Sequence, residues 1–160
     1  MYIKKNSVII PLPTAEKRIA VHNGGIFMIT RSEQREQAFI LIFEKSFSAE
    51  TELNELYDLA LENEIIADSE FTKALAFKTC ENISDIDPVI EKYSKGWKLS
   101  RISRVALAVL RLAVCEMKYF DDIPVGVTIN EAVELCKKYA SKDDYAFVNG
   151  ILSSVSKEEK

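Results

Sequence analysis

The sequence predicts an all-α fold, a compact bundle of about seven helices with short connections. Five glycines and four prolines among 160 residues leave room for few turns, which disfavours a sheet of many strands. Apolar residues make up 48% of the chain and charged residues 29%, an ordinary balance for a globular domain. Beyond about residue 30, the apolar residues recur at helical spacing almost to the end.

The first residues differ from the remainder of the chain. Residues 1–27 contain two prolines and a Gly-Gly pair, and they show no helical period. The stretch Asn23–Phe27 back-translates to a purine run resembling a ribosome-binding site, a short spacer before the codon of Met28. We therefore expect translation to start at Met28 and 1–27 to be a non-native or disordered extension. The helical domain is predicted over residues 28–156, followed by a charged tail, 157–160.

Three helices are predicted in the first half of the domain. Thr30–Glu33 forms a capping box, which starts a helix at about residue 30. A second helix is expected over about 50–65 and a third over about 69–82. The apolar positions predicted to face inward are Ala38, Phe39, Leu41, Ile42, Leu53, Leu56, Leu59, Ala60, Phe71, Leu75 and Cys80.

The fourth and fifth helices have different patterns. Asp85–Asp87 is predicted to cap the fourth helix, because Pro88 then falls in its first turn, and Gly96 ends it. The fifth, over about 100–120, is apolar nearly all round, which predicts a central, buried helix.

The last two helices are separated by a short polar turn. Pro124 begins the sixth helix. The polar turn Ser141–Asp144 separates it from the seventh helix and caps the seventh. Taken as a helix, residues 143–156 place four apolar side chains on one face, in the i, i+3, i+4, i+7 pattern of a core stripe. These residues are Val148, Ile151, Leu152 and Val155.

Phe147 lies at the edge of that stripe. Asp143 sits one turn before it and Gly150 lies just beyond, so an aromatic ring, a carboxylate and a bare backbone share one face. Phe147 either widens the core or forms a contact site on which a flat partner stacks while approaching Gly150. The periodicity leaves both interpretations open.

Two arginines occupy the start of the first helix. Arg31 and Arg35 are i, i+4 neighbours at the end where the helix dipole disfavours cations, so an arriving phosphate would stabilise them. The preferred interpretation is that Glu33 and Glu36 neutralise them on a solvated face. The net charge of −4 also argues against a bulk electrostatic binder of nucleic acid.

The fifth helix carries a basic stripe along its otherwise apolar surface. Its members are Arg101, Arg104, Arg111 and Lys118. Such side chains snorkel along the rim of a core or pair with carboxylates of neighbouring helices. We expect Arg111, in the middle of the stripe, to be a structural partner rather than a phosphate ligand.

Several functions are disfavoured by the residues that the chain contains. Its three cysteines are widely spaced and odd in number, which predicts reduced thiols and suits the cytoplasm. No apolar run is long enough for a membrane span. The predicted helices have no histidine, no glycine-rich phosphate loop and no activated nucleophile, so we expect neither an enzyme nor a metal or cofactor site.

Several motifs together resemble the NusB family of bacterial transcription antitermination factors. They occur in the family's order and at matching spacing: Trp97–Ile102, Leu110–Glu116, Asp122–Pro124, Ile129–Tyr139 and Phe147–Gly150. The resemblance covers about residues 29–156. It implies an all-α fold of two small helical subdomains. It also implies binding of boxA-type single-stranded RNA together with NusE, a small-subunit ribosomal protein, within the RNA polymerase antitermination complex on ribosomal RNA operons.

The resemblance also implies individual site residues. The RNA contacts carried over by position are Arg31, Arg35, Lys137, Asp143 and Phe147, and the positions near NusE are Phe43 and Ala106. Three features depart from the family pattern: Ser32–Gln34 interrupts the first arginine cluster, Ala146 replaces a common basic residue, and Ala106 replaces a common acidic one. The alternative is a NusB-like module acting only in protein–protein interaction or self-association, with a homodimer left open.

Overall fold

The computed structural model describes residues 29–158, and the predictions for residues 1–27 and for Met28 lie outside the described residues. The all-α prediction is confirmed, since this part of the chain contains seven α-helices, one 3-10 helix and no strand. The helices are α1 Arg31–Lys45, α2 Leu53–Glu62, α3 Glu70–Glu81, α4 Ile83–Tyr93, η2 Leu99–Arg101, α5 Arg104–Tyr119, α6 Val125–Tyr139 and α7 Lys142–Glu158. Helix α7 thus continues two residues into the predicted tail.

Two helices begin with the reciprocal caps that the sequence predicts. In α1, the Glu33 N–H donates to Thr30 Oγ1 at 3.2 Å, and the Thr30 N–H donates to Glu33 Oε2 at 2.7 Å. At α7, the Asp144 N–H donates to Ser141 Oγ at 3.2 Å, and the Ser141 N–H donates to Asp144 Oδ2 at 3.2 Å. These caps fix the starts of α1 and α7, two of the three helices that carry the candidate RNA contacts.

Two predictions about helix phase are wrong. Helix α4 starts at Ile83 rather than near Pro88, which is an exposed residue inside the helix. The earlier start places Ile86 and Ile90 one turn apart, both fully buried, and this burial outweighs the proline's usual preference for a first turn. In α2, Leu59 points outward with 38% of its surface exposed, because its neighbour Ala60 takes the inward position.

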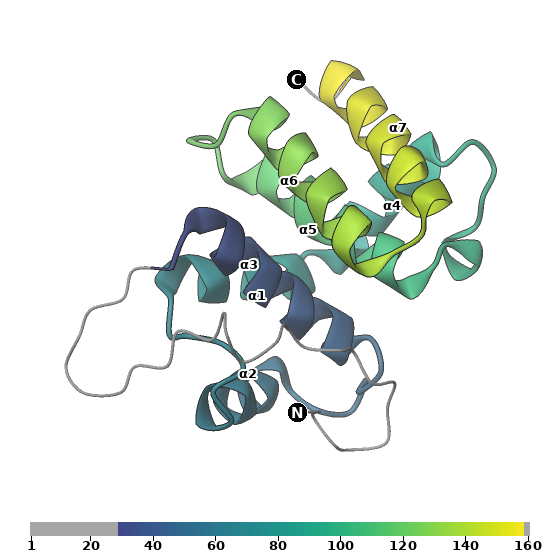
Figure 1. Ribbon diagram of the computed structural model, residues 1–160. Coiled ribbons are helices and arrows are strands. Elements are labelled where there is room, and N and C mark those ends of the chain that lie inside the picture. Colours follow the sequence, from purple (N-terminus) through teal and green to yellow (C-terminus); the bar gives the residue numbers. More distant parts are fainter. Residues whose placement is uncertain (1–28, 159–160) are drawn as a thin grey trace.

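Helix α5 lies at the centre of the molecule, as its all-round apolar pattern predicts. Figure 1 shows α1–α3 grouped on one side and α4, α6 and α7 on the other, with α5 between them. Helix α5 packs against α1, α3, α4, α6 and α7. This arrangement matches the expected pair of small helical subdomains.

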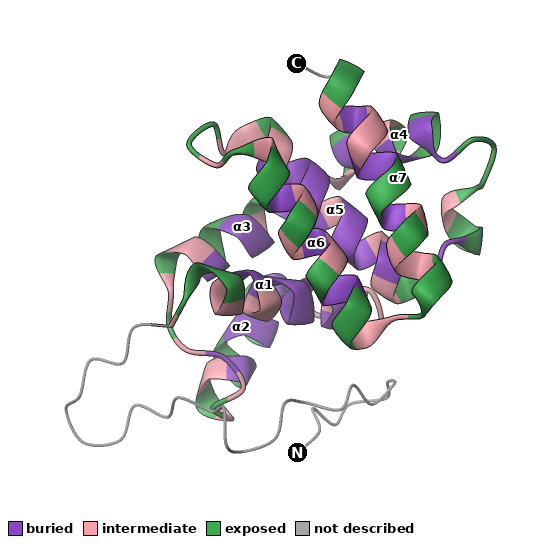
Figure 2. Ribbon diagram, turned by 45° about the horizontal axis from the view of Figure 1, so that its top comes forward, coloured by how far each residue is buried: buried purple, intermediate pink, exposed green. Residues whose placement is uncertain are grey.

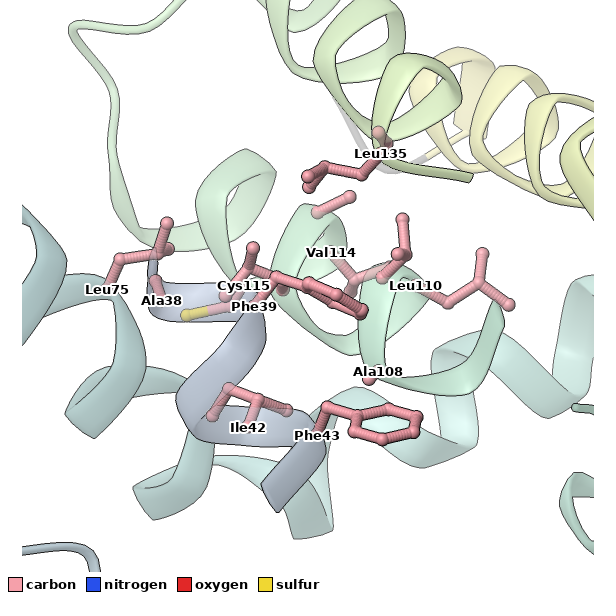
Figure 3. Close-up of a cluster of buried hydrophobic side chains, with 14 of the residues drawn as sticks. Ala38, Phe39, Ile42, Phe43, Leu75, Ala108, Leu110, Val114, Cys115 and Leu135 are labelled. Atoms are coloured by element: carbon pink, nitrogen blue, oxygen red, sulfur yellow. The ribbon is translucent and has the colours of Figure 1, made fainter. Parts of the chain in front are cut away.

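The core runs through both groups of helices. Figure 3 shows Phe39 of α1 beside Val114 of α5, with Ile42 of α1 below Phe39 and with Leu75 of α3 and Leu135 of α6 on other sides. Figure 2 shows buried residues concentrated on the inner helix faces and exposed residues on the outer ones. Within residues 29–158, no helix has an apolar stretch that could traverse a lipid bilayer.

Candidate nucleic-acid interface

An open groove lies between the start of α1 and the second half of α6. Its volume is about 360 Å³. The lining residues are Ser32, Glu36, Glu131, Glu134, Leu135, Lys137 and Lys138. Lys138 Nζ closes one side by pairing with Glu36 Oε1 at 2.5 Å, and the Tyr139 hydroxyl donates to the same carboxylate. The groove therefore brings the start of α1 together with the end of α6, which leads into α7.

Arg31 stands exposed at the start of α1. Its guanidinium carbon lies 3.9 Å from the centroid of the Phe71 ring, a cation–π contact that orients the side chain. Glu33 is used by the Thr30 cap and Glu36 by Lys138, so the predicted neutralisation of Arg31 by these two carboxylates is wrong. Among the described carboxylates, none lies within ion-pair distance of Arg31, which leaves its charge open to an anion.

Arg35 occupies a different environment, because only 5% of its surface is exposed. Its Nε donates to Glu116 Oε2 at 2.8 Å and its Nη2 to Glu116 Oε1 at 3.0 Å, while Thr128 Oγ1 donates to Glu116 Oε1 at 2.6 Å. Glu131 lies 3.9 Å from Arg35 Nη1. The solvated-face interpretation is wrong for Arg35. Its buried guanidinium ties α1 to α5, and the RNA contact expected of it stays a prediction.

Lys137 lies exposed on the rim of the groove. Its Nζ pairs with Glu134 Oε1 at 2.7 Å, and this hydrogen bond raises the pKa of Lys137. The ammonium also lies 5.9 Å from the centroid of the Tyr145 ring in α7. Because both partners are exposed, the ion pair contributes little to stability and is easily exchanged for a phosphate.

Phe147 is half-buried, and each of the two interpretations describes part of its surroundings. It packs against the core, and the centroid of its ring lies 6.1 Å from that of Trp97. Asp143 and Gly150 are exposed beside it, and a side chain added at Gly150 would meet open space. The Phe147 ring therefore packs on the core and on Trp97, while the exposed residues Asp143 and Gly150 leave room for a ligand beside it.

Tyr145 is a candidate contact that the sequence analysis overlooked. It is half-buried in the first turns of α7, and the Lys137 ammonium lies 5.9 Å from its ring centroid. The sequence contains no signal for Tyr145, because residues two apart in a helix face nearly opposite ways and its contact with Lys137 is made only in the folded chain.

The two positions expected near a protein partner are both buried. Phe43 packs between Phe39 and Phe47, with ring centroids 5.8 and 5.0 Å away, and Ala106 is fully enclosed. The outward neighbour is Phe47, half-buried, with the Arg104 guanidinium carbon 4.4 Å from its ring centroid. The contact predictions for Phe43 and Ala106 remain open, and any partner on this face meets Phe47 and Arg104 first.

Two arginines of the predicted basic stripe, Arg111 and Arg104, make structural contacts with other elements. Arg111 Nε and Nη2 donate to Asp87 Oδ1 and Oδ2 at 2.8 and 2.7 Å, so its prediction as a structural partner is confirmed. Arg104 Nη1 donates to the Ser46 carbonyl at 2.9 Å, which links α5 to the end of α1.

The described chain is an all-α bundle of seven helices with an open groove lined by both acidic and basic side chains. The chain belongs to the NusB family, whose model matches residues 32–157. It is 47% identical to the transcription antitermination protein NusB of Acetivibrio thermocellus over 133 residues, covering 79% of this chain and 88% of that protein. It is 42% identical to that of Ruminiclostridium cellulolyticum over 129 residues, covering 79% and 88%.

Solved structures give the same result. T. maritima NusB superposes with a TM-score of 0.74 at 33% identity, covering 82% of this chain and 94% of that one. A crystal structure of the antitermination factors NusB and NusE in complex with dsRNA matches with a TM-score of 0.72 at 30% identity, covering 79% and 96%.

Proposed function

We propose that this protein is an RNA-binding transcription antitermination factor. It pairs with NusE on boxA-type RNA and promotes processive transcription of ribosomal RNA operons, which places it in the cytoplasm. The observation that carries the proposal is the match of nearly the whole described chain to a NusB structure that holds both NusE and RNA. The relatives that match over most of their length support the same function.

The exposed side chains at the starts of α1 and α7 and on the groove fit the chemistry of RNA. Lys137 on the groove and Arg31 at the start of α1 supply cations for phosphate oxygens. The Phe147 ring supplies a face for an unpaired base, and the Asp143 carboxylate accepts hydrogen bonds from a base amino group. In this proposal Arg35 acts indirectly, because its pair with Glu116 holds the start of α1 against α5.

The second partner is proposed to bind beside the buried positions Phe43 and Ala106. Both residues are buried under the surface between α1 and α5, and Phe47 and Arg104 form the outer part of that surface. A hollow of about 350 Å³ adjoins this surface and is lined in part by Ser46 and Leu107. NusE is proposed to occupy this face.

The test is a titration of boxA-type RNA with and without NusE at stated salt concentrations. The acidic net charge of −4 and the interrupted arginine cluster at the start of α1 predict weak binding by the isolated chain and much tighter binding with NusE. The slope of log K against log salt should be about −0.7 for each phosphate engaged.

Two outcomes would contradict the proposal. Tight binding of any RNA by the isolated chain, without sequence preference, would indicate a general RNA binder. Binding of NusE without any gain in RNA affinity would favour the alternative of a module that acts only in protein interaction.

A further inference from the structure

The connection between α4 and α5 exposes the only tryptophan of the chain. Trp97 has 55% of its surface exposed, the largest fraction among the exposed large apolar side chains of residues 29–158. Its ring is tilted by 57° to that of Phe147, with centroids 6.1 Å apart. An exposed indole beside a half-buried phenyl ring gives two aromatic surfaces at one edge of the molecule.

The backbone that carries Trp97 is firmly held although its side chain is exposed. The Trp97 N–H donates to the Ser94 carbonyl at 3.2 Å, and the Ser94 hydroxyl lies 2.6 Å from the Trp97 carbonyl. Ser94 itself is buried. Lys95 and Gly96 reverse the chain in left-handed conformations, with φ of 50° and 88°. The indole is therefore positioned before any ligand arrives, which lowers the entropic cost of binding.

The same connection is fastened to the first turn of α7. The Ser103 hydroxyl donates to Asp144 Oδ1 at 3.0 Å, and this hydrogen bond joins the end of the α4–α5 connection to the start of α7. Figure 1 shows this connection beside the first turns of α7. Exposed cations lie close in sequence to the two rings: Lys95 and Lys98 on either side of Trp97, and Lys142 five residues before Phe147. None of the three has an anionic partner among the described residues.

We propose that Trp97 extends the RNA site, forming with Phe147 a two-ring platform on which neighbouring unpaired bases of the RNA stack. Lys95 and Lys98 would then hold the phosphates between those bases. Stacking on aromatic rings combined with backbone cations is the general way in which proteins bind single-stranded nucleic acid. This inference rests on the proposed function and adds to it a second aromatic contact and a direction for the strand, from the α1–α6 groove across α7 to the α4–α5 connection.

The first test observes Trp97 directly. Because the chain has one tryptophan, fluorotryptophan labelling gives a single fluorine NMR signal from this protein, even when unlabelled NusE is present. Addition of boxA-type single-stranded RNA to the protein–NusE complex should shift that signal with the same midpoint as RNA binding. A shift caused by NusE alone, with no further change on adding RNA, would assign the indole to a protein interface and overturn the proposal.

The second test compares variants in RNA titrations with NusE. Trp97→Ala should lower the affinity roughly 5- to 100-fold, the effect of losing one stacked base, whereas Trp97→Phe should recover most of it. Val127→Ala is the matched control, because Val127 is also an exposed apolar residue, with 42% exposure on another helix. Unfolding curves for all variants show whether each is fully folded. Unchanged affinity in folded Trp97→Ala would overturn the proposal.

Charge variants test the cations separately. Lys98→Gln should reduce the salt slope by about 0.7, the value of one phosphate contact to a single strand, while Lys157→Gln at the far end of α7 should leave it unchanged. Equal slopes for both variants would count against a phosphate path over the connection. If the unmodified protein with NusE binds no RNA, the proposed function itself fails. If the unmodified protein binds RNA and folded Trp97→Ala binds it equally well, only the inference about Trp97 fails.

Discussion

Glu116 is the side chain on which the junction between the two groups of helices depends most. It is buried and accepts hydrogen bonds from Arg35 of α1 and Thr128 of α6. Glu116→Gln should lower the free energy of unfolding by about 3–5 kcal/mol, because it leaves the buried Arg35 guanidinium without its counter-charge. Urea unfolding measures the change.

The control for this variant is Glu134→Gln, which removes the exposed partner of Lys137. An exposed ion pair is worth about 0–1 kcal/mol, so the control should unfold almost like the unmodified protein. If both variants changed stability equally, the buried pair would not be the junction described above.

Phe147→Ala separates the two interpretations of that residue. Because the ring is half-buried, its loss should cost less stability than the roughly 3–5 kcal/mol of a fully buried phenylalanine. Loss of a stacked base should weaken RNA binding by about 1–3 kcal/mol. Unfolding and RNA titration are measured on the same variant. A large stability loss with unchanged affinity of the folded protein would make Phe147 a core residue only.

Glu44 is a buried carboxylate without a cation within ion-pair distance among the described residues, and burial raises its pKa above the ordinary 4.5. The folded state therefore favours the protonated form, and ionisation of Glu44 at neutral pH opposes folding. Glu44→Gln should be more stable than the unmodified protein at neutral pH. This advantage should shrink as the pH falls through the raised pKa and vanish below the ordinary one.

The measurement for Glu44 is thermal unfolding across that pH range. Glu50→Gln serves as control, since Glu50 is exposed at the end of the α1–α2 connection. A Glu44→Gln variant that is equally stabilised at acidic and neutral pH would show that packing, not ionisation, is responsible.

Among the elements, α1 depends on the cap that Thr30 provides directly before its first residue. Thr30→Ala removes the hydroxyl that accepts the Glu33 N–H, and should cost about 1 kcal/mol. Ser32→Ala, two residues on, removes an exposed hydroxyl and should not destabilise the helix. Chemical denaturation of both variants provides the comparison. Equal stabilities would mean that tertiary packing alone fixes the start of α1.

Helix starts were predictable from the sequence where the cap is local. The boxes at Thr30 and Ser141 use residues three positions apart, so the sequence contains the whole interaction. The start of α4 was not predictable in this way, because it depends on burying Ile86 and Ile90 against other helices. The same reason explains Arg35, whose partner Glu116 is 81 residues away.

At the scale of the whole molecule, the candidate site combines parts of the chain that are distant in sequence. Arg31 belongs to the first helix, Lys137 to the sixth and Phe147 to the seventh, and the packing of α1 and α7 around α5 and α6 unites them. Phe147 was recognisable from the pattern of a single helix. The contributions of Tyr145 and Trp97 were not, since they depend on contacts with Lys137 and Phe147 that only the folded chain reveals.

The central claim, an antitermination factor that acts through boxA RNA and NusE, is tested most directly by transcription itself. The measurement is read-through of a terminator by purified bacterial RNA polymerase on paired templates, one with boxA and one with boxA scrambled. The protein and NusE together are expected to increase read-through on the boxA template, and neither is expected to do so alone. Equal read-through on both templates, or none on either with NusE and RNA bound, would contradict it.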